Sequence, residues 1–144
     1  MDENKTKLKI SLNSFDDLES SRNLIIEFCG RYCKTSDELD LLEMSILEAC
    51  HNAILHGKKK ESNSICELKL LYDNQSIKAV VKNYGNRFDV AEKDEFSIEQ
   101  DFLQFKNGGL GIPLIKAIMD SVEYERKSNE LNKLTIIKKL KKKQ

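Results

Sequence analysis

The chain has 144 residues, of which 40% are hydrophobic and 33% are charged, a composition typical of one globular domain rather than of a disordered or fibrous protein. Its 24 lysine and arginine residues equal its 24 aspartate and glutamate residues, so overall charge does not favour direct binding to nucleic acid. The start, MDENKTKLKISL, lacks the apolar run of a signal peptide, and no stretch approaches the ~20 apolar residues of a membrane span. We therefore expect one cytoplasmic domain over residues 1–144, without membrane contact.

The first predicted elements are a strand and a helix. Lysine alternates with leucine and isoleucine over residues 7–12, which predicts a half-buried strand. Asn13 or Ser14 is suited to cap a following helix, and Gly30 weakens the end of that helix. The expected buried face of this helix consists of Leu18, Leu24, Ile25, Phe28 and Cys29.

A second, longer helix is predicted next. Ser36 is a suitable N-cap, and Asp37 and Glu38 are favourable near the positive end of the helix dipole. Gly57 should end the helix. Its expected buried stripe consists of Leu39, Leu42, Ile46, Ala49, Cys50 and Ala53.

The central part of the chain predicts a β-hairpin. Residues 65–72 and 76–82 have strand-like patterns and are joined by a turn at residues 73–75 (DNQ). Residues 83–86 (NYGN) are expected to form a second turn. The polar segment that follows, up to residue 107, has no consistent period, which is typical of a functional lid.

The last part predicts a short helix over residues 112–119, after a glycine-rich stretch, and two closing strands over residues 121–126 and 133–140. Together these elements predict an α+β fold, a two-layer sandwich with helices on one face of a mostly antiparallel mixed sheet. The four cysteines should be reduced in a cytoplasmic protein. Cys29 and Cys33 could place two metal ligands on one helix, but no second close pair completes a site, so we expect the cysteines to be core residues.

The second predicted helix carries polar groups that could perform chemistry. In the stretch EACHNAILHG, Glu48, Asn52 and His56 recur every four residues, which places them along one side of the helix. An amide oxygen of Asn52 could bind Mg²⁺, and Glu48 could orient or deprotonate an attacking hydroxyl or water. A solvated polar stripe is the alternative interpretation of these residues.

Two glycine-containing stretches could complete a nucleotide site. Gly85, directly after a strand, permits either positive φ or close backbone approach to a ligand. Residues 107–111 (NGGLG) precede a helix, where backbone N–H groups and the positive dipole end favour phosphate. No lysine or serine follows these glycines, so the P-loop motif is absent.

In their order and spacing, these stretches resemble the GHKL (Bergerat-fold) ATP-binding superfamily, and most closely the small bacterial anti-sigma factor serine/threonine kinases of the RsbW type. Residues 48–57 resemble the N box of that family, E-A-x-x-N-A-x-x-H-G, and residues 81–89 (VKNYGNRFD) resemble its first glycine box. Residues 107–111 resemble the second glycine box, and residues 132–138 (NKLTIIK) resemble the closing strand. The likeness extends over nearly the whole chain.

The resemblance implies ATP and Mg²⁺ as cofactors and a role for each matching residue. Glu48 would be the catalytic base and Asn52 the magnesium ligand. The expected nucleotide-binding residues are Asn52, Asn83, Gly85, Gly108, Gly109, Leu110, Gly111 and Thr135. The implied function is an ATP-dependent kinase that works as a homodimer, binds a sigma factor and phosphorylates an anti-anti-sigma factor. Arg22, on the polar side of the first helix, is then expected to offer a free guanidinium to a partner carboxylate.

Two departures from the family pattern leave a second function open. Asn83 stands where the family usually has the aspartate that binds the adenine amino group, and Arg87 stands where it usually has a second glycine. A neutral acceptor in place of a charged one reduces the strength of that hydrogen bond by about 1–2 kcal/mol. The alternative function is therefore a degenerate, non-catalytic GHKL protein-binding module with weak or no nucleotide binding.

Overall fold

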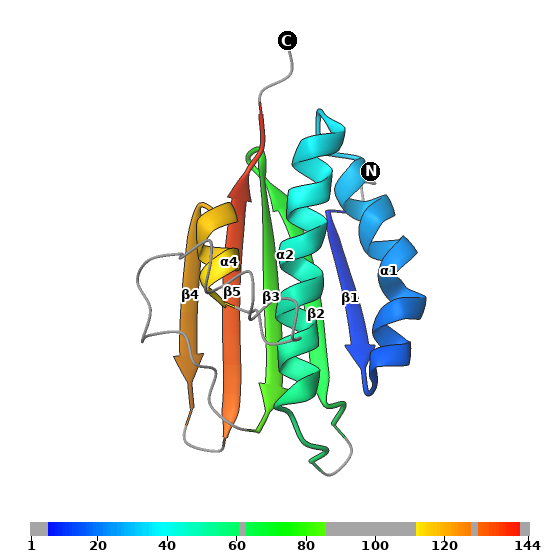
Figure 1. The fold of residues 1–144 in the computed structure, drawn as a ribbon, viewed down its shortest axis with the longest axis vertical. Helices are drawn as coiled ribbons and strands as arrows, with labels where there is room; N and C mark the ends of the chain where they lie inside the picture. Colours follow the sequence, from blue (N-terminus) through cyan, green and yellow to red (C-terminus); the bar gives the residue numbers. More distant parts are fainter. Residues whose placement is uncertain (1–5, 61–62, 86–111, 128–129, 142–144) are drawn as a thin grey trace.

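A helical layer covers one face of an antiparallel sheet in the computed structural model, which describes residues 6–60, 63–85, 112–127 and 130–141 (Figure 1). The helices are α1 (Phe15–Gly30), α2 (Ser36–Leu55) and α4 (Ile112–Ile118). The strands are β1 (Lys7–Leu12), β2 (Cys66–Asp73), β3 (Ser76–Tyr84), β4 (Ser121–Arg126) and β5 (Leu131–Lys139). This arrangement confirms the predicted two-layer α+β class.

The sheet has the strand order β1-β2-β3-β5-β4, and all four pairings between the described strands are antiparallel. The β2–β3 hairpin turns through Asn74 and Gln75, whose φ values of 50° and 61° are those of a two-residue turn that follows the twist of its strands. The strand β5 lies between β3 and β4, so the last hairpin adds to the edge of β3. As a result, Asn83 faces Asn132 across the β3–β5 pair.

The predicted turn at residues 83–86 is wrong in its first half. Asn83 and Tyr84 are the last residues of β3, because the pairing with β5 continues as far as Tyr84 opposite Leu131. The final strand likewise begins at Leu131, two residues earlier than the sequence predicts. Strand ends depend on the partner strand, and the local pattern does not contain that information.

Helix α1 begins with a reciprocal cap. The Ser14 hydroxyl accepts a hydrogen bond from the Asp17 N–H at 3.1 Å, and the Asp17 carboxylate accepts one from the Asn13 N–H at 2.7 Å. Ser14 is therefore the cap among the two predicted candidates. Four of the five predicted core residues of this helix are buried, but Leu24 is 49% exposed and its predicted burial is wrong.

Helix α2 is capped by Thr35 rather than by the predicted Ser36, since the Thr35 hydroxyl accepts the Glu38 N–H at 3.1 Å. The Glu38 side chain is buried, and its two carboxylate oxygens accept the backbone N–H groups of Lys34 at 2.8 Å and Lys141 at 2.7 Å. One buried carboxylate thus joins the start of α2 to the chain after β5. The sequence had assigned Glu38 only a favourable position in the helix dipole.

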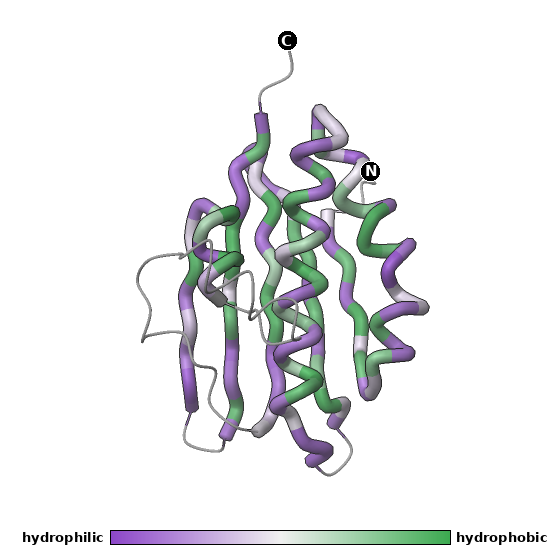
Figure 2. The backbone as a smooth tube through the Cα atoms, in the orientation of Figure 1, coloured by the Kyte–Doolittle hydropathy of each residue, from purple (hydrophilic) through white to green (hydrophobic). Residues whose placement is uncertain are grey.

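The core lies between the sheet and the inner faces of α1 and α2. Figure 2 shows hydrophobic and hydrophilic residues alternating along the strands, as one buried face requires. Cys29, Cys50 and Cys66 are fully buried free thiols, and Cys33 is half-buried. Burial raises the pKa of Cys29 to about 12 and that of Cys33 to about 11, so these thiols are core groups of low reactivity. None of the described helices is both long enough and apolar enough to cross a bilayer.

Helices α1 and α2 are joined by an ion pair. The Nε of Arg22 on α1 donates to Oε2 of Glu43 on α2 at 2.7 Å, and Glu43 is largely shielded from solvent. The pair raises the pKa of the Arg22 guanidinium through the hydrogen bond and the charge of Glu43. The prediction that this guanidinium is free is therefore wrong, because a residue on the neighbouring helix already binds it.

The end of α2 lies against the end of β3 at a point of close backbone contact. Gly57 forms an isolated bridge with Gly85, and the Lys58 N–H donates to the Tyr84 carbonyl at 2.7 Å. Gly85 has a φ of 149°, and a Cβ there would collide with the carbonyl oxygen of His56. The positive φ predicted for Gly85 is present. The close approach seen here is to the backbone of His56 and Gly57, and the predicted approach to a ligand stays a prediction.

We expect Gly85→Ala to lower the free energy of unfolding by about 2–4 kcal/mol, because the added methyl group requires both an unfavourable φ and displacement of the His56–Gly57 backbone. Urea unfolding followed by circular dichroism measures the change. Gly30→Ala is the matched control, since its Cβ would lie 3.7 Å from the nearest side-chain atom, in ordinary contact. Equal effects of the two substitutions would contradict this role for Gly85.

Candidate active site

The three polar residues of the EACHNAILHG stretch occupy different environments in the structure. Glu48 is half-buried, Asn52 is 8% exposed, and His56 is an exposed residue at the C-cap of α2. A step of four residues turns an α-helix by about 40° beyond a full turn, so successive members move around the helix. The prediction that all three residues lie along one side of the helix therefore holds for Glu48 and Asn52, which are one turn apart, and is wrong for His56.

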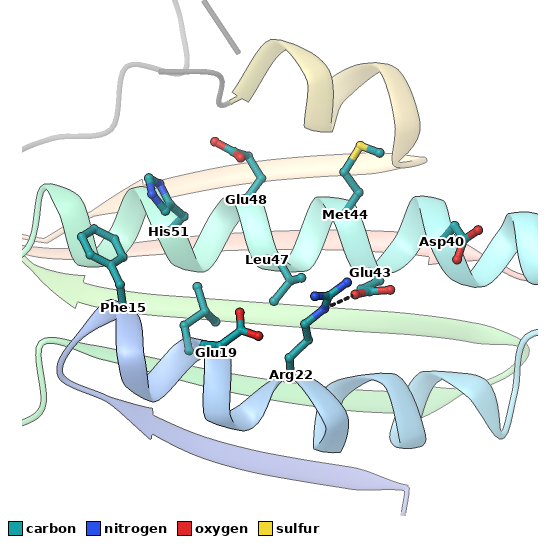
Figure 3. Close-up of a pocket in the computed structure, with 10 residues that line it drawn as sticks. Phe15, Glu19, Arg22, Asp40, Glu43, Met44, Leu47, Glu48 and His51 are labelled. Atoms are coloured by element: carbon teal, nitrogen blue, oxygen red, sulfur yellow. Dashed lines mark hydrogen bonds and ion pairs between the residues drawn. The ribbon is translucent and has the colours of Figure 1, made fainter. Parts of the chain in front are cut away.

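Glu48 lies in the second half of α2, on the side that faces α4 in Figure 3. Burial raises the pKa of its carboxyl group above the ordinary value, since a less hydrated site disfavours the charged form. A carboxylate with a raised pKa holds a transferred proton more readily, so Glu48 is suited to act as a general base.

Asn52 follows one turn later and is turned toward the sheet. Its carboxamide has no hydrogen-bond partner within the described residues, although the residue is almost completely buried. An amide oxygen in this state is available to a ligand, and it is a donor type that Mg²⁺ accepts.

Asn83, at the end of β3, lies beneath this turn of α2. Its Nδ2 donates to the Ala53 carbonyl at 2.8 Å, while its Oδ1 is buried and has no partner in the described part of the chain. An aspartate at this position would place a negative carboxylate oxygen against the negative end of the Ala53 carbonyl. The amide of asparagine donates a hydrogen bond to that carbonyl instead, which explains why asparagine fits here. The unpaired lone pairs of this buried Oδ1 form an acceptor suited to an amino group of a ligand.

Asn132 is a buried residue of this region that the sequence did not single out. Its Oδ1 accepts hydrogen bonds from the Tyr124 hydroxyl at 2.6 Å and from Nη1 of Arg126 at 2.9 Å. Nη1 of Arg126 also donates to the Gly85 carbonyl at 2.9 Å, and Nδ2 of Asn132 lies 3.4 Å from the same oxygen. This network fixes the ends of β3, β4 and β5 beside Asn83. Its only sequence signal is an asparagine on the apolar side of a strand.

Thr135 does not lie near the other candidate residues that the structure describes. Side chains alternate between the two faces of a strand, and in β5 Asn132, Leu134 and Ile136 are the buried, helix-facing positions. Thr135 therefore lies on the opposite face of the sheet from Glu48 and Asn52. Gly108, Gly109, Leu110 and Gly111, together with Arg87 and the predicted lid, lie outside the described residues.

Comparison with known proteins identifies the family. The histidine kinase-like ATPase domain family matches the chain over residues 14–138. The chain belongs to this family. That membership confirms the predicted GHKL resemblance, and it means that Glu48, Asn52 and Asn83 lie on the elements of a histidine kinase-like ATPase domain.

Among individual relatives, this ATPase domain is 28% identical to the "Serine-protein kinase RsbW" of Bacillus subtilis, in an alignment covering 65% of the chain and 61% of that relative. It is 30% identical to the protein of the same name from Bacillus pumilus, with 64% and 60% covered. An "Anti-sigma F factor" of Anoxybacillus flavithermus is 21% identical with 94% of both chains covered. The alignments with the RsbW proteins thus span about 60% of those relatives' length.

A solved structure shares the fold. A chain in "The crystal structure of SiaB-SiaC complex from Pseudomonas aeruginosa" has a TM-score of 0.62 and 11% identity, with 92% of this ATPase domain and 88% of that chain covered. At this identity the likeness concerns the fold alone.

We expect Asn83→Asp to lower the free energy of unfolding of the domain by about 1–3 kcal/mol, because it removes the donor to the Ala53 carbonyl and introduces a buried charge beside it. Urea unfolding at pH 7 measures the effect. Asn23→Asp, at an exposed position of α1, is the matched control and should change stability little. An Asn83→Asp variant as stable as the wild type would show that the bond to Ala53 is unimportant.

We expect Glu48→Gln to raise the melting temperature at pH 7. The pKa of Glu48 is raised in the folded state, so the folded chain loses stability relative to the unfolded chain as the pH rises through that pKa. The neutral glutamine removes this loss, and the difference should disappear at about pH 3, where the carboxyl group is protonated in both states. Thermal unfolding at both pH values tests this, with Glu27→Gln at an exposed site as control. A difference that is the same at both pH values would contradict the titration of Glu48 as its cause.

Proposed function

We propose that this chain is an ATP-dependent serine/threonine protein kinase that acts by partner switching in the cytoplasm, binding a sigma factor and phosphorylating an anti-anti-sigma factor. The observation that carries the proposal is the position, one turn apart on α2, of the half-buried Glu48 carboxylate and the Asn52 carboxamide, beside Asn83, whose Nδ2 binds the Ala53 carbonyl and whose Oδ1 is buried without a partner in the described part of the chain. The names of the relatives, which include a serine-protein kinase and an anti-sigma factor, support it.

In the proposed reaction Glu48 takes the proton of the acceptor hydroxyl. The hydroxyl oxygen forms a bond to the γ-phosphorus of ATP as the bond from that phosphorus to the leaving oxygen of ADP breaks. The raised pKa of the Glu48 carboxyl suits this step, because a base is most effective when its pKa is closer to the working pH. Asn52 would hold Mg²⁺ through its amide oxygen, and the metal would supply neutralisation of phosphate charge.

The nucleotide-binding residues of the proposal come partly from the described geometry and partly from the resemblance to the family. The Oδ1 of Asn83 accepts a hydrogen bond from the amino group of the base, and it does so without a charge. Gly108, Gly109, Leu110 and Gly111 hold the phosphates through backbone N–H groups, by resemblance to the family. In this proposal the β5 residue next to the nucleotide base is Asn132 and not Thr135. Asn132 lies on the helix-facing side of the sheet, opposite Asn83 in the β3–β5 pair.

The partners and the homodimer are part of the proposal. The relatives are named for a kinase activity and for an anti-sigma factor, and the solved structure with the same fold is titled as a complex of two proteins. A non-catalytic binding module remains the second candidate. The neutral Asn83, tied to the Ala53 carbonyl through its Nδ2, favours that candidate because it weakens base recognition.

Two variants test the kinase. We expect Glu48→Gln to bind ATP and Mg²⁺ almost as the wild type does while phosphoryl transfer falls by ~10²–10⁴, the usual contribution of a positioned base. Asn52→Ala should instead weaken Mg-ATP binding. Isothermal titration with ATP measures binding. Transfer of labelled phosphate from ATP to protein, in an extract of source cells that lack this chain, measures activity.

The outcomes separate the two candidates. ATP binding with transfer that depends on Glu48 supports the kinase. Binding without transfer in the wild type supports the non-catalytic module. No binding at millimolar ATP contradicts the kinase and also supports that module, whose nucleotide binding is weak or absent. Equal loss of binding in the two variants would make Glu48 a structural residue rather than the base.

A further inference from the structure

A row of three polar residues crosses the helix-facing side of the sheet, near the ends of β4 and β3 in Figure 1. Arg126 lies opposite Asn132 in the β4–β5 pair, and Asn132 lies opposite Asn83 in the β3–β5 pair. Residues directly opposite each other in a sheet point to the same face. The row therefore leads from an exposed arginine on the edge strand β4 to Asn83, which is 2% exposed.

Arg126 joins the ends of three strands through one nitrogen atom. Its Nη1 donates to the Gly85 carbonyl at 2.9 Å and to Oδ1 of Asn132 at 2.9 Å. The amide of Asn132 lies 3.4 Å from the same carbonyl, which is beyond the usual length of an N–H···O bond. A hydrogen bond from a charged donor is also about twice as strong as a neutral one. Arg126 is therefore the stronger of the two side-chain donors to Gly85.

Gly85 is the point where this link affects β3. It directly follows the last residue of the strand, and its φ of 149° lies in a region that favours glycine. Its N–H donates to the Glu130 carbonyl at 3.1 Å, and its backbone forms the bridge with Gly57. Glycine has wide backbone freedom, so its carbonyl keeps one direction only when hydrogen bonds hold it. Arg126 supplies such a bond, two residues after Asn83.

The acceptor of Asn83 is sensitive to small movements of this strand end. Its Nδ2 binds the Ala53 carbonyl at 2.8 Å, and its Oδ1 is buried without a partner in the described part of the chain. The direction of Oδ1 thus depends on how the end of β3 sits against α2. Hydrogen bonds have a narrow range of length, so a shift of about 1 Å is enough to lose one.

We propose that Arg126 is a positioning residue for base recognition: by binding Asn132 and the Gly85 carbonyl together, it keeps the Oδ1 of Asn83 directed at the amino group of adenine. The inference rests on the proposed function, and it assigns the selectivity of the nucleotide site to a side chain on the edge strand. Its distinguishing consequence is a change in preference between bases. A residue that only stabilises the fold does not change that preference.

The test compares ATP with purine riboside triphosphate, which carries a hydrogen in place of the amino group. Isothermal titration in the presence of Mg²⁺ measures the binding of each to the full chain. We expect the wild type to bind ATP about threefold to tenfold more tightly, the contribution of one neutral hydrogen bond. In Arg126→Met the affinity for ATP should fall to that for the analogue, while the affinity for the analogue stays unchanged.

Two variants of the same corner are the matched controls. Lys58→Met removes another cation, whose Nζ binds Oε1 of Glu130 at 2.8 Å, and should keep the preference for ATP. Tyr124→Phe removes the hydroxyl that donates to Asn132 at 2.6 Å but leaves both bonds of Arg126, so it should also keep the preference. Circular dichroism checks the fold of each variant. If Arg126→Met folds poorly, Arg126→Lys replaces it, and the loss of the planar guanidinium should reduce the preference at least twofold.

Amide hydrogen exchange measures the positioning without nucleotide. The N–H groups of Gly85 and Lys58 bind the carbonyls of Glu130 and Tyr84 at the end of β3. Arg126→Met should speed exchange of these two amides at least tenfold and leave the amides of the β1–β2 pair unchanged. Equal acceleration throughout the sheet would overturn the inference, because Arg126 would then act on global stability.

The outcomes separate this inference from the proposed function. A preference for ATP that is lost in Arg126→Met and kept in Lys58→Met supports the positioning role. The inference is overturned, and the kinase stands, if the wild type binds ATP and Arg126→Met keeps the preference, or if Lys58→Met loses it equally. Equal affinity of the wild type for the two nucleotides also overturns it, because Asn83 then does not read the amino group. Binding of neither nucleotide by the wild type overturns the kinase and this inference together.

Discussion

The backbone contact between the end of α2 and the end of β3 is the constraint on which the candidate active site depends. Gly57 and Gly85 meet without side chains between them, and the Lys58 N–H binds the Tyr84 carbonyl at 2.7 Å. The Asn83 side chain adds a bond of 2.8 Å to the Ala53 carbonyl on the last turns of the helix. These contacts set the height of α2 above the sheet, and they hold the last turns of the helix, which carry Asn52 and Ala53, against the end of β3.

The same closeness explains why the Asn83 Oδ1 has no partner in the described part of the chain. The Asn83 amide uses its donor to bind the Ala53 carbonyl, so its Oδ1 points away from that carbonyl. Groups of this kind reduce the stability of the isolated fold and increase its affinity for a ligand that supplies the missing bonds. The polar network around Asn132 is satisfied and holds the strand ends in place.

Helix α2 borders two regions, because different sides of one helix face the nucleotide region and α1. Asn52 is turned toward the sheet, whereas Met44 and Asp40 face α1 and solvent. Glu48 lies between these two sides of the helix and is half-buried. The Arg22–Glu43 ion pair joins α1 to α2.

The sequence by itself determined the fold class, the β2–β3 hairpin and the position of Glu48 and Asn52 on one helix, and it limited the N-cap of α1 to two residues. These features depend on periods and turn residues within a few positions. Only the tertiary structure decided that Asn132 faces Asn83, that Thr135 lies on the other side of the sheet, and that Arg22 is bound by Glu43. Leu24 fits the local helical period, yet it is exposed because no element of the described chain covers it. Strand register and helix–helix contacts join residues far apart in the chain, and no local pattern records which partner a side chain will meet.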